Sequence, residues 1–193
     1  EVKECSELFE ENEIDRISII PESSLVTPES LALLRKTFEG RANWVLQQIL
    51  KVQAVLASQA DASLIVDSDT LLLTKRPWFG SNGNQLLTPS YEYNSPYYHF
   101  LHRLGISDSN PKYTFISHHM LMQRKVLEET CQRINWIDID TMVEYICRNA
   151  NVELDSPICV EYELYAQSLF MYAPEKIHLG KWANISIPRR YLD

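Results

Sequence analysis

Apolar residues recur at helical spacing in several parts of the chain. In residues 44–58 they are three or four positions apart, which predicts a helix with one buried face. These positions are Val45, Ile49, Val52 and Leu56. A second helix is predicted over residues 28–40, because Thr27 and Pro28 form a typical helix start and Gly40 a stop. Further helices are predicted over residues 96–104, 124–134, 140–150 and 164–171.

The strand pattern is clearest just after the 44–58 helix. Residues 64–66 are apolar in succession, which predicts a central strand that is buried on both faces. Shorter strands are predicted at residues 17–20, 113–116, 157–160 and 176–179. A helix followed by a buried strand indicates an α/β fold. We find no repeat and no linker, so residues 1–193 are predicted to form one domain.

Composition excludes several classes of function. The net charge of the 193 residues is −8, with 26 acidic and 18 basic side chains, whereas a nucleic-acid binder needs a basic surface. No apolar stretch reaches the roughly 18 residues of a membrane span. We therefore expect a cytoplasmic protein with no membrane span, or one peripheral to the inner membrane. The four cysteines form no C-x-x-C pair, which indicates free thiols.

The candidate chemistry begins where the 64–66 strand ends. Asp67 and Asp69 flank Ser68 at this point, and a strand end in an open α/β sheet is where ligands bind. Two carboxylates this close repel each other, and a divalent cation relieves that repulsion. Mg²⁺ or Mn²⁺ takes one or two carboxylates and fills its other positions with water and phosphate oxygens. The alternative is a turn in which one aspartate is a cap and the other is solvated.

Two enzyme classes place an acidic pair after an apolar strand. One is the GT-A glycosyltransferase, in which D-x-D binds the metal of a nucleotide-sugar complex. The other is the haloacid-dehalogenase-like phosphatase, with Asp67 as nucleophile and Asp69 as general acid. The phosphatase would also use Ser117, Lys125, Asp138 and Asp140, which occur in the required order. However, residues 117–140 are too few for the helices and strands of that fold.

Further segments resemble a family of uncharacterised bacterial proteins that is regarded as related to GT-A glycosyltransferases. They are WVLQQILK at residues 44–51, SHHM at residues 117–120 and VEYELY at residues 160–165. The resemblance covers roughly residues 14–185. It implies a Rossmann-like mixed sheet flanked by helices, with the nucleotide and metal part in residues 1–75 and the acceptor part in residues 76–193.

The resemblance also implies a function and its cofactors. We expect a Mn²⁺- or Mg²⁺-dependent transfer from a nucleotide-sugar donor, with UDP-sugars favoured, to a glycan or glycolipid acceptor in polysaccharide biosynthesis. Asp67 and Asp69 would hold the metal, and Lys51 and Ser68 would contact the nucleotide or its phosphates. The first βα unit of a GT-A domain is either missing from this chain or reduced to residues 1–20. A catalytically degenerate binding module is the remaining alternative.

The segment after residue 177 resembles the end of a retaining GT-A family, where a histidine is followed by glycine and lysine. In this comparison His178 would be a third metal ligand and Lys181 a phosphate contact, and Trp182 would stack on a sugar. Imidazole suits Mn²⁺, and a lysine would stabilise the leaving diphosphate. The alternative is a surface histidine beside a turn.

Two more pairs are candidates for contact with the reacting groups. Glu161 and Glu163 share a face if that segment is extended and diverge if a helix has begun, and one would accept the acceptor proton in an inverting reaction. His118 and His119 should point in opposite directions, with one facing the sugar. Tyrosines in residues 91–98 could stack on sugar rings, although packing is the commoner role of tyrosines.

Overall fold

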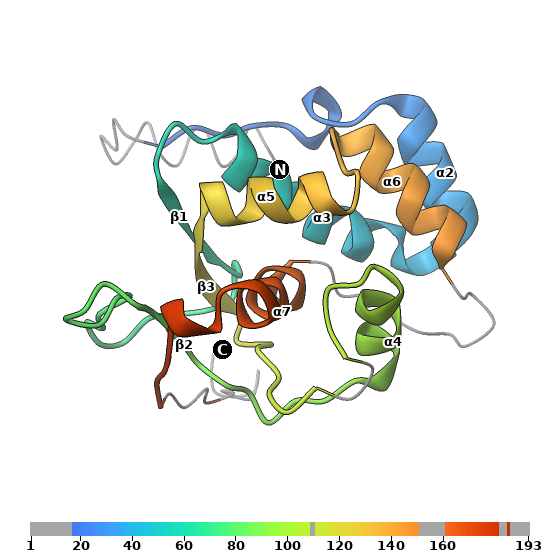
Figure 1. Ribbon diagram of the computed structural model, residues 1–193. Coiled ribbons are helices and arrows are strands. Elements are labelled where there is room, and N and C mark those ends of the chain that lie inside the picture. Colours follow the sequence, from blue (N-terminus) through green and yellow to red (C-terminus); the bar gives the residue numbers. More distant parts are fainter. Residues whose placement is uncertain (1–16, 109–110, 151–160, 182–184, 186–193) are drawn as a thin grey trace.

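The computed structural model describes residues 17–108, 111–150, 161–181 and 185. Helices account for about 50% of the structure and strands for 12%, so the chain is mixed α/β, as predicted, but its sheets are small. In chain order the elements are η1 (Glu22–Ser24), α2 (Pro28–Phe38), η2 (Glu39–Arg41), α3 (Ala42–Ala57), β1 (Ala62–Val66), β2 (Gln85–Leu87), α4 (Ser95–Arg103), β3 (His119–Gln123), α5 (Arg124–Arg133), α6 (Ile139–Asn149), α7 (Tyr162–Tyr172), η4 (Pro174–Lys176) and β4 (Ile177–Leu179). Figure 1 shows α2, α3, α5 and α6 grouped on one side of the molecule, with α4 and α7 on the other.

Helix starts follow the capping chemistry of the sequence. The Thr27 side chain accepts a hydrogen bond from the Ser30 backbone N–H at 3.3 Å, and proline occupies the first position of α2, as predicted. Asp138 and Thr141 form a capping box at the start of α6. The Asp138 carboxylate accepts from the Thr141 N–H at 2.8 Å. These local contacts explain why helices were the more predictable part of the fold.

The predicted apolar face of α3 is confirmed. Val45, Ile49 and Val52 are at most 1% exposed and belong to the main core. α3 packs against α2, α5 and α6, and the chain then returns into β1. The predicted helices at 96–104, 124–134, 140–150 and 164–171 are also confirmed, with small shifts at their ends. The main core extends from α2 to α7, and within the described ranges no helix is both long and apolar enough to cross a bilayer.

The sheets differ from the predicted covered sheet. β1 pairs antiparallel with β3, with Val66 opposite His119, and β2 pairs parallel with β4. Burial of both faces of residues 64–66 was a wrong prediction, because Leu64 is 40% and Val66 37% exposed. Alternation explains this, since Ile65 packs on the core while its two neighbours point the other way.

Two other predicted strands are also wrong. Residues 17–20 form no strand, and Ile17 and Ile20 are 45% and 62% exposed. Residues 113–116 make only a single bridge, between Thr114 and Ser90. The reason is visible at Phe115, whose backbone N–H donates to a side-chain carboxylate and so is not available to a neighbouring strand. The predicted strand at 157–160 lies outside the described residues, whereas that at 176–179 is confirmed as β4.

Candidate functional site

Asp67 is the centre of a charged cluster at the end of β1. It follows Val66, and its backbone N–H donates to the His118 carbonyl at 2.9 Å, which continues the pairing of β1 with the chain before β3. Its own carbonyl accepts from the Thr70 N–H at 2.9 Å, so the chain turns immediately after the strand. These two bonds fix the Asp67 side chain at the strand end.

Lys51 of α3 joins two acidic side chains that are far apart in the sequence. Its ammonium donates to the Asp67 carboxylate and also to Glu161 Oε1, the latter at 3.1 Å. The Lys51 side chain is 13% exposed, that of Asp67 18% and that of Glu161 6%. One cation is thus shared by two largely buried carboxylates, and its single charge offsets only part of their combined charge.

Tyr162 and His118 complete the contacts of the Asp67 carboxylate. The Tyr162 hydroxyl donates to Oδ1 at 2.9 Å, and its ring lies beneath the Lys51 ammonium, 4.8 Å from it. His118 Nδ1 lies 3.1 Å from Oδ2 and is the donor when that nitrogen carries the proton. The His118 backbone has a left-handed φ of 59°, and its side chain is 50% exposed. The cluster is therefore open to solvent on the His118 side.

The pKa shifts follow from these contacts. Burial alone would raise the pKa of the Asp67 carboxyl, but the hydrogen bond and charge of Lys51 outweigh it and hold that pKa below its ordinary value. Burial would lower the pKa of Lys51, but Glu161 and Asp67 together raise it, so the ammonium stays charged. At Glu161 burial dominates, and its pKa is raised despite the nearby Lys51.

A second polar group lies beside the cluster, around His119. Arg76 lies 2.8 Å from His119 Nε2 and donates to the Thr88 hydroxyl at 2.9 Å, and its guanidinium stacks over the Trp78 ring at 4.4 Å. Burial lowers the pKa of His119, and the Arg76 charge lowers it further, so the imidazole is neutral at pH 7. His118 and His119 thus have different partners and different exposure, since His118 is half exposed and His119 is buried.

The remaining predicted ligands are not gathered at Asp67. Ser68 and Asp69 are exposed on the turn after β1, and the Asp69 carboxylate makes no hydrogen bond or ion pair with a described residue. His178 and Lys181 are exposed on and just after β4. In the part of the chain that the structure describes, no group of three or more His, Cys, Asp or Glu side chains could hold a metal, and nothing connects His178 to Asp67. Trp182 lies outside the described residues.

Glu163 is separated from Glu161 because α7 has begun. Glu161 is the residue before the first turn, and Glu163 lies inside that turn, fully buried. The Glu163 carboxylate accepts from the Phe115 N–H, from the Tyr98 hydroxyl at 3.0 Å and from Gln167 at 2.9 Å. Burial raises the pKa of Glu163 to about 7. These contacts indicate a structural role in the core.

The residues of the phosphatase alternative are dispersed. Asp138 caps α6, and Asp140 accepts from the hydroxyls of Thr27 and Ser30 at 2.9 and 2.6 Å. The buried Ser117 hydroxyl donates to the His119 carbonyl at 2.6 Å. These contacts give the phosphatase alternative no support.

Sequence reasoning missed two members of this region. Tyr162 stood inside a recognised segment but was given no role, and Arg76 stood in a proline-rich loop with no motif around it. The hydrogen bond of Tyr162 to Asp67 depends on how α7 packs beside β1, so no local signal in the sequence indicated it. No protein-family model, curated protein or solved structure matches this chain significantly.

Proposed function

We propose that this chain is a GT-A-type glycosyltransferase that moves a sugar from a nucleotide-sugar donor to a hydroxyl of a glycan or glycolipid. The observation that carries the proposal is that segments far apart in the sequence meet at the charged cluster around Asp67. The segments at residues 44–51, 67–69, 117–120 and 160–165 were singled out separately in the sequence, and each contributes a side chain to the cluster or directly adjoins it. Such gathering of distant polar groups is typical of a functional site.

Lys51 is the residue for the donor diphosphate. Its ammonium is held in place by Asp67 and Glu161 and stays charged. Lys51 belongs to α3, and its ammonium reaches the end of β1, where Asp67 lies. A fixed cation stabilises the negative charge that develops on a leaving diphosphate. In this proposal Asp67 is a positioning residue that orients Lys51, because its oxygens already accept from Lys51, Tyr162 and His118.

Asp69 is the residue for the divalent cation. Its carboxylate is exposed one turn beyond Asp67 and has no described protein partner, and a single carboxylate with phosphate oxygens and water is a common set for Mg²⁺. A bound cation would neutralise charge on the diphosphate. His178 is not required in this arrangement.

Glu161 is the candidate proton acceptor in an inverting reaction. The acceptor hydroxyl would lose its proton to this carboxylate and its oxygen would attack the anomeric carbon. The bond from that carbon to the diphosphate would break, and the nucleoside diphosphate would leave with the electron pair. Burial raises the pKa of Glu161, which makes its carboxylate a better base than an exposed one. His118, half exposed at Oδ2 of Asp67, would contact the sugar.

The test is release of nucleoside diphosphate from a panel of UDP-, GDP- and CDP-sugars with Mn²⁺ or Mg²⁺. We expect one donor to be turned over, and Asp69→Asn to reduce the rate at least about a hundredfold, in the range seen when one transition-state contact is lost. Asp61→Asn is the matched control, because Asp61 is exposed at the other end of β1 and its side chain makes no described contact. A wild-type protein inactive on every donor, or equal effects of the two substitutions, would contradict the proposal.

A further inference from the structure

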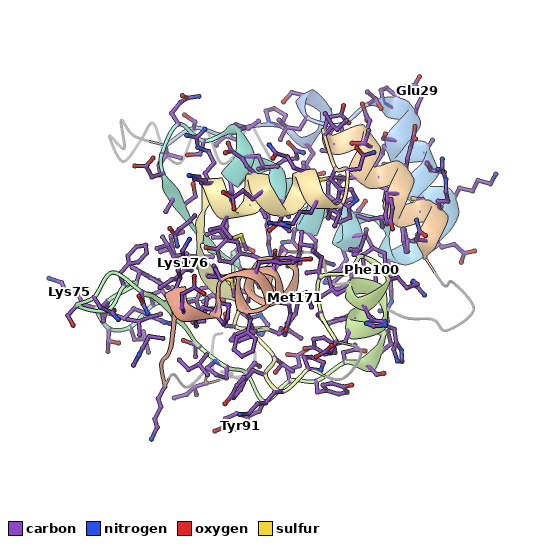
Figure 2. The ribbon with its side chains drawn as sticks, in the orientation of Figure 1. Glu29, Lys75, Tyr91, Phe100, Met171 and Lys176 are labelled. Carbon is purple, nitrogen blue, oxygen red and sulfur yellow. The ribbon has the colours of Figure 1, made fainter. Side chains whose placement is uncertain are left out.

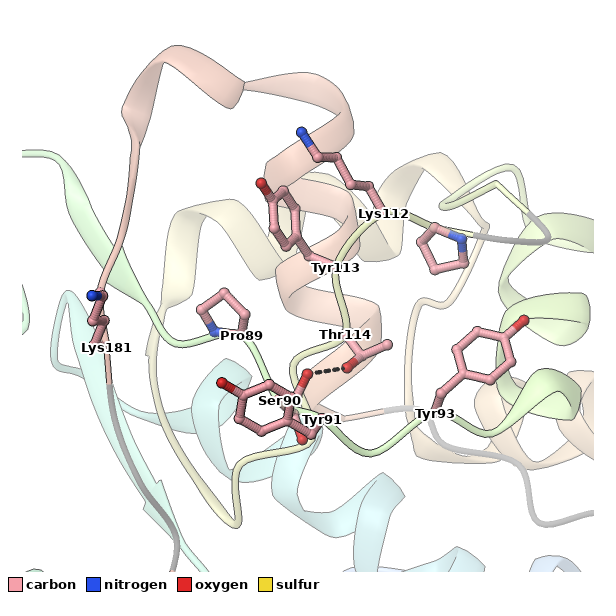
Figure 3. A pocket seen from close by; sticks show the side chains of 10 residues that line it. Pro89, Ser90, Tyr91, Tyr93, Lys112, Tyr113, Thr114 and Lys181 are labelled. Carbon is pink, nitrogen blue, oxygen red and sulfur yellow. Dashed lines mark hydrogen bonds between the residues drawn. The ribbon is translucent and has the colours of Figure 1, made fainter.

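A large pocket lies between the segments at residues 89–93 and 111–114. Its volume is about 920 Å³, and residues 180–181 close it on a third side. Figure 3 shows tyrosine rings from two of these segments around the hollow. They belong to Tyr91, Tyr93 and Tyr113. We call this feature the tyrosine groove.

Tyr91 and Tyr93 are the exposed rings of the groove, whereas Tyr113 packs against Phe170, with 5.7 Å between ring centres. Tyr91 is fully exposed, at 104%, and Figure 2 shows it at the periphery of the molecule. Tyr93 is 49% exposed, with one face stacked on Tyr98 at 5.0 Å between ring centres, which leaves its other face free to contact a ligand. Exposed aromatic rings held in a concave site are typical of ligand contact, since a solvated tyrosine contributes little to folding.

The charge of the groove is opposite to that of the chain. Lys112 and Lys181 line it, and none of the described residues that line it is acidic, although the whole chain carries −8. Neither lysine forms a salt bridge with a described carboxylate, and the Lys112 ammonium lies 5.1 Å from the centre of the Tyr113 ring. Free cations beside aromatic faces favour a ligand that is both ring-shaped and anionic.

The floor of the groove is held by two hydrogen bonds, and it lies near the charged cluster along the chain. The Ser90 N–H donates to the Thr114 carbonyl at 2.7 Å, and the Thr114 hydroxyl donates to the Ser90 carbonyl at 2.8 Å. His118 follows Thr114 by four residues, so the groove floor and the cluster are at most about 14 Å apart along that segment. A chain lying in the groove could therefore reach the cluster.

We propose that the tyrosine groove binds an anionic saccharide chain, and that it is the acceptor site of the transferase. The second clause rests on the proposed function, whereas the first does not. Tyrosines from separate segments present several faces to a row of sugar rings, while a single nucleotide base would need one. The lysines select for carboxylate, sulfate or phosphate groups along the chain.

Direct binding tests this, with the metal and nucleotide omitted. The probes are a hexameric oligogalacturonate, a sulfated hexasaccharide and the neutral maltohexaose, each titrated by calorimetry at low salt. We expect at least one anionic probe to bind about tenfold or more tightly than the neutral one, and to weaken as salt is added. Failure of both anionic probes to bind, or equal binding of the neutral chain, overturns the proposal.

Substitutions locate the binding. Tyr91→Ala and Lys112→Ala should each weaken binding at least about fivefold, and because both side chains are exposed neither change should affect folding. The matched controls Phe79→Ala and Lys75→Ala, an exposed aromatic and an exposed lysine outside the groove, should bind as the wild type does; Figure 2 shows Lys75 on another loop, well away from Tyr91. Wild-type affinity in Tyr91→Ala, or competition of the probe by UDP alone, overturns the assignment.

The two proposals fail separately. If the protein binds the anionic chain but turns over no nucleotide sugar, the groove proposal holds and the transferase proposal fails. If the protein turns over donors but binds no anionic chain, the transferase proposal holds and the groove proposal fails.

Discussion

Glu161 and Glu163 are two residues apart and have opposite surroundings. Glu161 faces the Lys51 ammonium at the solvent-accessible cluster, whereas Glu163 is in the core and accepts only from neutral donors. The difference arises because α7 begins between them, so the two side chains leave the helix in different directions. Two acids that are close in sequence therefore need not share a site. The partner of each carboxylate, a cation for Glu161 and neutral donors for Glu163, separates a candidate for chemistry from a residue of the core.

The largest expected effect comes from removing the cation of the cluster. Lys51→Met would remove the ammonium that contacts both the Asp67 and the Glu161 carboxylate. We expect a loss of about 4 kcal/mol in the free energy of unfolding, because one partner of a buried ion pair is deleted. Urea denaturation measures it. Lys36→Met, an exposed lysine on α2, should change almost nothing, and a similarly small loss in Lys51→Met would show that the cluster is solvated.

The next effect is the pH dependence of stability that arises from Glu163. Its pKa is raised to about 7 in the folded protein, so the folded state binds a proton that the unfolded state releases above about pH 4.5. Stability should therefore fall as the pH rises from 4.5 to 7, by about 3 kcal/mol from this group. The lowered pKa of Asp67 acts in another window: its contribution is present above about pH 4 and is lost on further acidification.

Glu163→Gln isolates that contribution. The variant should lose most of the slope between pH 4.5 and 7, measured by urea unfolding at several pH values, while any contribution from the raised pKa of Glu161 remains. Glu144→Gln, at an exposed glutamate on α6, is the matched control and should keep the wild-type slope. An unchanged slope in Glu163→Gln would mean that its carboxyl titrates normally.

A smaller effect is expected from the two tyrosines whose hydroxyls donate to Glu163 and Asp67. Tyr98→Phe removes the hydroxyl that donates to the buried Glu163, and Tyr162→Phe removes the one that donates to Asp67. We expect losses of about 2 and about 1 kcal/mol in unfolding free energy, because the second carboxylate keeps the Lys51 and His118 contacts. Thermal denaturation at pH 8 measures both. The reverse order would contradict the assignment of Glu163 to structure.

The smallest stability effect is expected at His118. Because its backbone is left-handed, His118→Asn is the suitable change, since asparagine tolerates that conformation. We expect less than about 0.5 kcal/mol on unfolding, because the side chain is half exposed. Donor turnover should nevertheless fall. A variant with normal turnover would remove His118 from the site.

The sequence predicted what local chemistry determines. Thr27 with Pro28 marked the start of α2, and the spacing of apolar residues defined the buried face of α3. It failed where long-range contacts decide. The Phe115 N–H is taken by the Glu163 carboxylate, so residues 113–116 form no strand. β1 has one exposed face because only Ile65 packs on the core, while Leu64 and Val66 point away from it.

The site was predictable in part for the same reason. Asp67, Lys51 and Glu161 could be nominated from strand ends, helix faces and resemblance, but the ion pairs that join them depend on how α3, β1 and α7 pack. The position of His178 likewise depends on tertiary structure, because β4 pairs with β2. The number of residues between Asp67 and His178 does not predict this pairing. Arg76 lies in a loop without periodicity, so nothing local identified it.

Calorimetric titration of UDP, with and without Mn²⁺, tests the central claim that the cluster at Asp67 is a metal-dependent nucleotide site. We predict that UDP binds with Mn²⁺, that binding weakens at least about tenfold when the metal is withheld, and that Asp69→Asn behaves with metal as the wild type does without it. Equal UDP binding in all of these conditions, or none in any, would contradict the account.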